Sequence, residues 1–111
     1  MLRVLVVGFG DIAGRGIRAI LRHPQILVEE CGTDTVTEAM AVTRPDVLVL
    51  EGGVQGGDAL ATRMAADAPG TTVVLCSAHR TDMRVFPASG GCFTRPLSAQ
   101  ALIDIVRGGT G

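Results

Sequence analysis

Several apolar runs in this 111-residue chain end in a side chain that can do chemistry. Glu51 follows one run, Ser77 follows the next, and Arg95 stands beside a weaker third run. Side chains that directly follow parallel strands lie at the carboxyl edge of a sheet, where ligands commonly bind. A guanidinium fork pairs well with a carboxylate or with another anion. These residue types are therefore candidates for an ion pair or an anion site, if the fold brings them together.

The glycine-rich segment 8–14 follows the first apolar run and opens a helical pattern. Glycine at positions 8 and 10 and alanine at position 13 fit the G-x-G-x-x-A form of a dinucleotide-binding loop, which lets a phosphate approach the backbone at a helix N-terminus. Glu29 or Glu30 stands near the position that binds the ribose in such sites. This pattern alone is a weak signal, and the chain has no second half to enclose a whole dinucleotide.

The elements that must position these residues are predicted from hydrophobic periodicity. Short β-branched runs alternate with stretches of helical spacing, which indicates a parallel sheet covered by helices. Five strands are expected, at 3–7, 26–30, 46–50, 72–76 and 91–94. Helices are expected after Asp11, from Thr35 to just before Arg44, from Asp58 to Asp67, and after Ser98. Asp11 and Ser98 are the expected N-caps of the first and last helix, and Thr35 to Glu38 has the spacing of a capping box. The segment 79–90 contains Pro87 and ends at glycines, so any helix there is predicted to be short or irregular.

Composition restricts the chain to one domain, expected over 1–107, with 108–111 as a tail or the start of a linker to a further domain. The formal net charge is −1, and the ten basic residues, all arginine, are scattered. We therefore expect no nucleic-acid surface on this domain. The first apolar run is too short to cross a membrane and lacks a signal-peptide pattern, so a cytoplasmic location is predicted.

Histidines and cysteines give no sign of catalysis. Cys31, Cys76 and Cys92 lack the spacing of a metal knuckle or redox pair, and Cys76 lies within a predicted strand. His23 and His79 are not paired with a nucleophile. The sequence predicts no enzyme, no metal and no cofactor.

Three junctions taken in order resemble those of the receiver domains of response regulators. Residues 44–51 (RPDVLVLE) resemble the third strand and phosphorylation loop, 72–79 (TVVLCSAH) the fourth strand with its Ser/Thr-Ala switch, and 93–98 (FTRPLS) the fifth strand with its Lys-Pro-Leu junction. The resemblance covers nearly the whole chain. It implies a three-layer α/β/α flavodoxin-like fold, with a five-stranded parallel sheet of order 2-1-3-4-5 and a shortened or irregular fourth helix.

The same resemblance implies that the phosphoacceptor pocket is degenerate. A working receiver holds magnesium with two acidic residues after the first strand and an aspartate after the third. Here Gly8 and Phe9 replace the acidic pair, Glu51 replaces the aspartate and Arg95 replaces a lysine, while Ser77 retains the switch hydroxyl. Magnesium prefers oxygen ligands, so phosphoryl capture is expected to be lost. We expect Glu51 and Arg95 to form a standing ion pair instead, or to lie unpaired at the rim.

The signalling surface also departs from the family pattern. Cys92 stands where receivers carry an aromatic switch residue, and the stretch from 79 to 95 is about one helical turn shorter than usual. A homodimer is expected through a face that includes Phe93, Leu97 and Leu102.

The expected function is a non-phosphorylatable regulatory domain of bacterial two-component signalling or transcription regulation, acting through protein contacts. One alternative is a small-molecule sensor, in which Phe9 walls the cleft and Arg95 anchors an acidic group, unless Phe9 closes the cleft. A dinucleotide-binding Rossmann-like domain is the other alternative.

Overall fold

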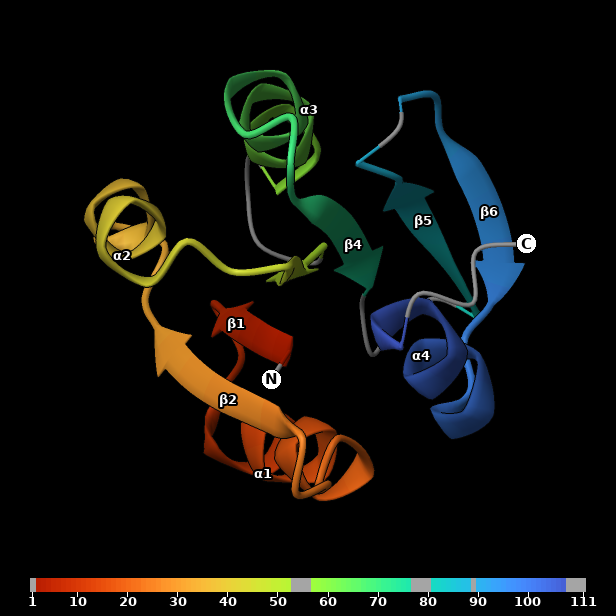
Figure 1. The fold of residues 1–111 in the computed structure, drawn as a ribbon. Helices are drawn as coiled ribbons and strands as arrows, with labels where there is room; N and C mark the ends of the chain where they lie inside the picture. The colour runs from red at the N-terminus through yellow and green to blue at the C-terminus, as the bar shows by residue number, and fades with distance from the viewer. Residues whose placement is uncertain (1, 53–56, 77–80, 89, 108–111) are drawn as a thin grey trace.

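The computed structural model describes residues 2–52, 57–76, 81–88 and 90–107. In these ranges the chain forms four helices and six strands, arranged as three layers (Figure 1). In chain order they are β1 (Leu2–Val7), α1 (Asp11–Ile20), β2 (Ile26–Cys31), α2 (Val36–Thr43), β3 (Val47–Glu51), α3 (Gly57–Asp67), β4 (Thr72–Cys76), β5 (Asp82–Phe86), β6 (Phe93–Pro96) and α4 (Ala99–Val106). The predicted α/β class is confirmed.

One mixed sheet carries all six strands, in the order β2-β1-β3-β4-β5-β6. Strands β1 to β4 are parallel to their neighbours, with Val4 opposite Val28 and Val47, and with Glu51 opposite Cys76. Strand β5 runs antiparallel to β4, and β6 runs antiparallel to β5. The sheet therefore departs from the expected five-stranded parallel arrangement at its β5–β6 end.

The departure arises in the segment for which we expected a short helix. Residues of β5 alternate between buried and partly exposed, with Met83 and Val85 buried on one face and Arg84 half-buried on the other. This period of two suits a strand, and β4 offers an open edge to pair with it. Gly90 and Gly91, at φ 104° and 84°, then turn the chain into β6. The last strand starts later than predicted, so Cys92 precedes β6 and is exposed.

Each face of the sheet is covered by two helices, and each face has its own core. Helices α1 and α4 cover one face, and α2 and α3 cover the other (Figure 1). Leu102 of α4, which we expected on a dimer surface, is only 2% exposed and belongs to the first core. Phe93 and Leu97 are half-buried against the same core. Leu102 is therefore withdrawn from the expected dimer face, because α4 uses its apolar side against the sheet, while Phe93 and Leu97 remain partly exposed.

Helix ends agree only in part with their sequence signals. Ser98 is the N-cap of α4, and its hydroxyl accepts a hydrogen bond of 3.1 Å from the Ala101 N–H, as predicted. Thr35 precedes α2 but its hydroxyl donates to the Gly32 carbonyl, so the expected capping box is not formed. Asp11 is the first residue of α1 rather than its cap. Across the described helices, none has the length and apolarity needed to span a bilayer.

Candidate functional site

The carboxyl edge of the parallel strands places part of the predicted pocket together. Glu51 ends β3 beside Cys76, which ends β4, and the Gly52 N–H donates to the Cys76 carbonyl at 2.6 Å. Gly8 follows β1, the strand next to β3. Ser77 and His79 lie outside the described residues. Among the five predicted pocket residues, Glu51 is the one that has a carboxylate, and it is half-buried.

Gly8 and Phe9 form the turn between β1 and α1. Gly8 has a φ of 83°, and its N–H donates to the Cys31 carbonyl at the end of β2. The backbone of a residue with a side chain adopts such a φ only with strain, so this position favours glycine. Phe9 is half-buried and packs against the core that lies under α1 and α4. The turn thus supplies backbone groups and an apolar ring, and no side-chain oxygen.

Arg95 lies farther from Glu51 than the sequence suggested. Both β4 and β5 separate β6 from β3, which at the usual strand spacing puts the two backbones about 14 Å apart. The Arg95 guanidinium stacks over the Phe93 ring, 5.2 Å from its centroid. A direct ion pair between Glu51 and Arg95 would have to reach across two strands.

The Cys76 thiol lies beside Glu51 but is not suited to nucleophilic attack. Burial, and to a lesser degree the negative charge of Glu51, raise the pKa of Cys76 to about 12. A thiol with this pKa is protonated near neutral pH, and the thiolate is the reactive form. Burial likewise raises the pKa of Cys31. The reading of Cys76 as a core residue is confirmed by its 5% exposure.

Metal-ligating side chains do not gather in the part of the chain that the structure describes: no three His, Cys, Asp or Glu residues come close enough to hold one ion. Asp11, the acidic residue nearest to the degenerate pair, is exposed in the first turn of α1. An acid at that place interacts favourably with the helix dipole.

A cavity of about 670 Å³ lies between the β1–α1 turn and the end of β2. Its wall includes Glu30, whose carboxylate accepts a 3.2 Å hydrogen bond from Arg18 of α1. A Cβ at Gly14 would lie 2.6 Å from the Glu30 carboxylate, so glycine there lets this side chain lie against α1. The full lining is Gly8, Phe9, Gly10, Asp11, Arg15, Arg18, Glu30, Cys31, Gly32, Thr33 and Asp34. The glycine-rich motif predicted part of this wall, while Arg15, Arg18 and Asp34 carried no sequence signal.

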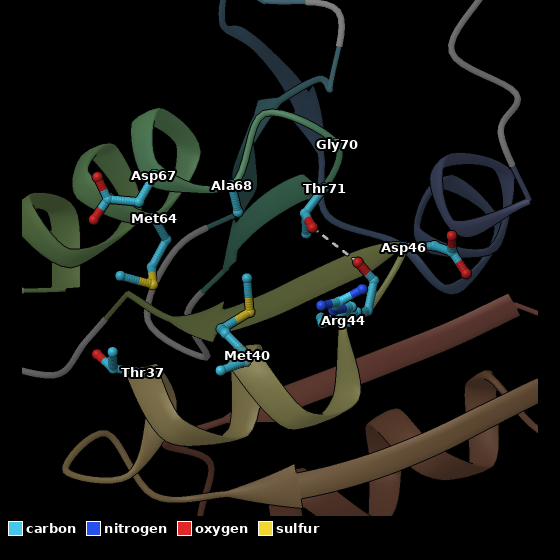
Figure 2. A pocket seen from close by; sticks show the side chains of 11 residues that line it. Thr37, Met40, Arg44, Asp46, Met64, Asp67, Ala68, Gly70 and Thr71 are labelled. Atoms are coloured by element: carbon cyan, nitrogen blue, oxygen red, sulfur yellow. Dashed lines mark hydrogen bonds between the residues drawn. The ribbon is translucent and has the colours of Figure 1, made fainter.

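A second cavity, of about 480 Å³, lies between α2 and α3 near the amino ends of β3 and β4. In Figure 2 the side chains of Met40 and Met64 point into the space between the two helices, and the Thr71 hydroxyl donates to the Pro45 carbonyl at 2.8 Å. Arg44 ends α2 in the left-handed conformation, with φ 48°. The sequence did not predict this cavity, because methionines at helical spacing are typical of a core.

Comparison with known proteins adds no family to this picture: no family model, curated protein or solved structure matches the chain. The fold itself defines the class, a three-layer α/β domain with a mixed six-stranded sheet. Function is therefore argued from the carboxyl edge of the sheet and the cavity beside it.

Proposed function

We propose that this chain is a receiver-like regulatory domain that is not phosphorylated and acts through protein contacts. The proposal depends on one observation: Glu51 ends β3, while the neighbouring turn after β1 consists of Gly8 and Phe9. In this proposal the sheet is a variant of the flavodoxin-like arrangement. The order β2-β1-β3-β4 is kept, and β5 is added between β4 and the strand that would be its usual neighbour.

The chemistry of these positions explains why phosphoryl transfer is not expected. Magnesium takes near-octahedral oxygen ligation, and neither Gly8 nor Phe9 has a side-chain oxygen to offer. Glu51 is one methylene longer than aspartate, and a displacement of about 1 Å can cost a positioned reaction about a hundredfold. The carboxylate is permanently present, so the domain holds a single state without a phosphoryl group.

A direct test is incubation with acetyl phosphate and magnesium, followed by intact mass spectrometry. The wild-type protein is expected to keep its mass. The matched variant carries Phe9→Asp together with Glu51→Asp, which restores one acid after β1 and the aspartate after β3. We expect this variant to gain one phosphoryl group slowly. A stoichiometric gain by the wild-type protein would refute the proposal.

A nucleotide-binding domain is the second candidate, favoured by the geometry of the β1–α1 turn. If Gly8 merely replaced an acidic residue, a positive φ would not be required there, yet φ is 83°. Gly10 precedes α1, and a Cβ on it would meet nothing within 4 Å. The adjoining cavity of about 670 Å³ is within the usual range for small-ligand sites, and Glu30 forms part of its wall.

Calorimetric titration with NAD(H) and NADP(H) separates the two candidates. Submillimolar binding that Gly10→Ala abolishes would favour the nucleotide site, because the added methyl group fills open space where a phosphate would approach. If the titration gives no binding heat, the nucleotide-binding candidate is rejected and the regulatory proposal is retained.

For the sensor alternative, Arg15 and Arg18 are the cationic groups near Phe9, in place of Arg95. A shift of the melting temperature with one member of a panel of acidic metabolites would reveal a ligand.

A further inference from the structure

Strand β2 forms one edge of the sheet, and its outward backbone groups are open to a further strand. In a parallel pair, every second residue of a strand directs its backbone N–H and C=O groups toward the neighbouring strand. The Leu2 N–H donates to the Gln25 carbonyl and the Gly8 N–H to the Cys31 carbonyl, which places the backbone groups of Leu27 and Glu29 toward β1. Since β2 lies at the edge of the sheet (Figure 1), Val28 and Glu30 direct their N–H and C=O groups away from β1.

We propose that this edge pairs antiparallel with β2 of a second copy of the chain, about a two-fold axis at Val28. Val28 then faces Val28 of the second copy, and the Glu30 N–H donates to the Ile26 carbonyl across the axis. The Ile26 N–H already donates to the His23 carbonyl, so the symmetric pair makes about four hydrogen bonds. The result is one continuous sheet through both molecules.

Charge complementarity supports a second copy as the occupant. A groove of about 480 Å³ lies between α1 and the β2 edge, and its rim carries Arg15 and Arg22, besides Arg18, which is paired with Glu30 of the same chain. Ile26 lines the same groove, and the two-fold register places Glu30 of the second copy opposite Ile26. An acidic side chain thus meets a basic rim twice, once on each side of the axis.

The acidic residues on β2 do not oppose this pairing. Two glutamates in an edge strand normally discourage pairing with another chain. Here Glu29 accepts a 2.9 Å hydrogen bond from the Thr43 hydroxyl, and Glu30 is paired with Arg18. In the two-fold register Glu29 faces Leu27 and Glu30 faces Ile26, so no acid lies directly opposite another acid.

Exposed apolar side chains lie at the same edge. Leu27 is 41% exposed on the α2 side of β2, and Val42 is 83% exposed next to Thr43, the residue that contacts Glu29. Leu27 would lose exposed apolar surface when a second strand pairs with β2. The other edge strand is protected, since β6 has only four residues and ends at Pro96, which has no N–H. The inference depends on the β2 edge and not on the receiver-like function.

The test is sedimentation velocity of the full chain from micromolar to millimolar concentration, because a small interface gives weak association. The wild-type protein is expected to shift from monomer to dimer. Val28→Pro removes the outward N–H at the axis while sparing the β1–β2 ladder, and it should raise the dimer dissociation constant at least about tenfold. The matched control Thr94→Pro makes the same change on β6 and should leave the constant unchanged.

Three outcomes would overturn the proposal: a wild-type monomer at every concentration, a dimer that Val28→Pro leaves intact, or a dimer that Thr94→Pro dissociates. If Val28→Pro fails to fold, as judged by circular dichroism, hydrogen exchange of the wild-type protein decides. The Val28 and Glu30 amides should become protected as concentration rises. Exchange at these amides that is independent of concentration would also overturn the proposal.

Discussion

At the scale of single residues, the β1–α1 turn distinguishes two glycines of the same motif. Gly8 has a φ of 83°, whereas Gly10 has a φ of −71° and open space where a Cβ would lie. Only the first is required by the backbone, since most residues adopt the conformation of the second without strain. The G-x-G-x-x-A pattern in the sequence does not distinguish the two glycines.

We predict that Gly8→Ala lowers the free energy of unfolding by about 1 to 2 kcal/mol, because alanine is strained at this φ. Gly10→Ala is the comparison and should cost less, because alanine adopts a φ of −71° without strain and only the preference for glycine at the N-cap of α1 is lost. Urea unfolding followed by circular dichroism measures both. Equal effects of the two substitutions would contradict the assigned turn.

Cys76 and Cys92 differ in burial and should differ in reactivity. We predict that a thiol reagent at neutral pH modifies Cys92 rapidly and Cys76 only after unfolding, because Cys92 is exposed and Cys76 is buried with a pKa of about 12. Peptide mass mapping after timed labelling reads out both sites. Labelling of Cys76 in the folded protein at the rate of Cys92 would contradict the assigned burial.

The raised pKa of Cys76 also predicts a pH dependence of stability. The folded value lies above the ordinary value of 9.0, so folding favours the protonated thiol. The corresponding stability is fully present below pH 9 and is lost as pH rises toward 12. Cys76→Val, which keeps an apolar side chain of similar size, should reduce this loss in urea unfolding at alkaline pH. An identical alkaline profile for the variant and the wild-type protein would assign the loss to other groups.

At the scale of elements, β5 is the segment that changes the expected fold. Met83 and Val85 are buried, and Arg84 reaches from β5 to Asp58 of α3 at 3.2 Å while stacking over Phe86 at 5.3 Å. The buried side chains hold β5 in the sheet, and the exposed ion pair adds little, since such pairs contribute about 0 to 1 kcal/mol.

We predict that Met83→Ala lowers the free energy of unfolding by about 2 to 4 kcal/mol, because it leaves a cavity under α4. Arg84→Ala, one residue away, should cost about 1 kcal/mol or less. Denaturant unfolding of both variants measures the difference. Similar small costs at both positions would indicate a surface helix instead of a strand.

Helix α4 depends on its N-cap. Ser98→Ala removes the acceptor for the Ala101 N–H and should cost about 1 kcal/mol, whereas Ser98→Asp keeps an acceptor and should cost little. Thermal unfolding by circular dichroism compares the two. A loss that is the same for both substitutions would point to a role other than capping.

At the scale of the whole molecule, one sheet separates two cores. Adjacent residues of β3 belong to different cores, Val49 to the one under α1 and α4 and Leu48 to the one under α2 and α3. Because both cores share the same strands, neither is able to unfold alone, and a single transition is expected for a domain of this size.

Much of this architecture was determined by the sequence itself. Strands β1, β3 and β4 are apolar, β-branched runs that are buried on both faces, and the order of the four strands β1 to β4 with helices between them predicts a parallel arrangement. Ser98 also predicted its cap correctly. Glu51, Gly8 and Phe9 were placed at the carboxyl edge because each directly follows one of these strands.

Only the tertiary structure decided the β5–β6 end of the molecule. The five residues of β5 include Arg84, and their local sequence is compatible with either a strand or an irregular helix. They form a strand because they pair with the open edge of β4, a contact that local sequence does not predict. Because β5 pairs with that edge, both β4 and β5 lie between Arg95 on β6 and Glu51 on β3.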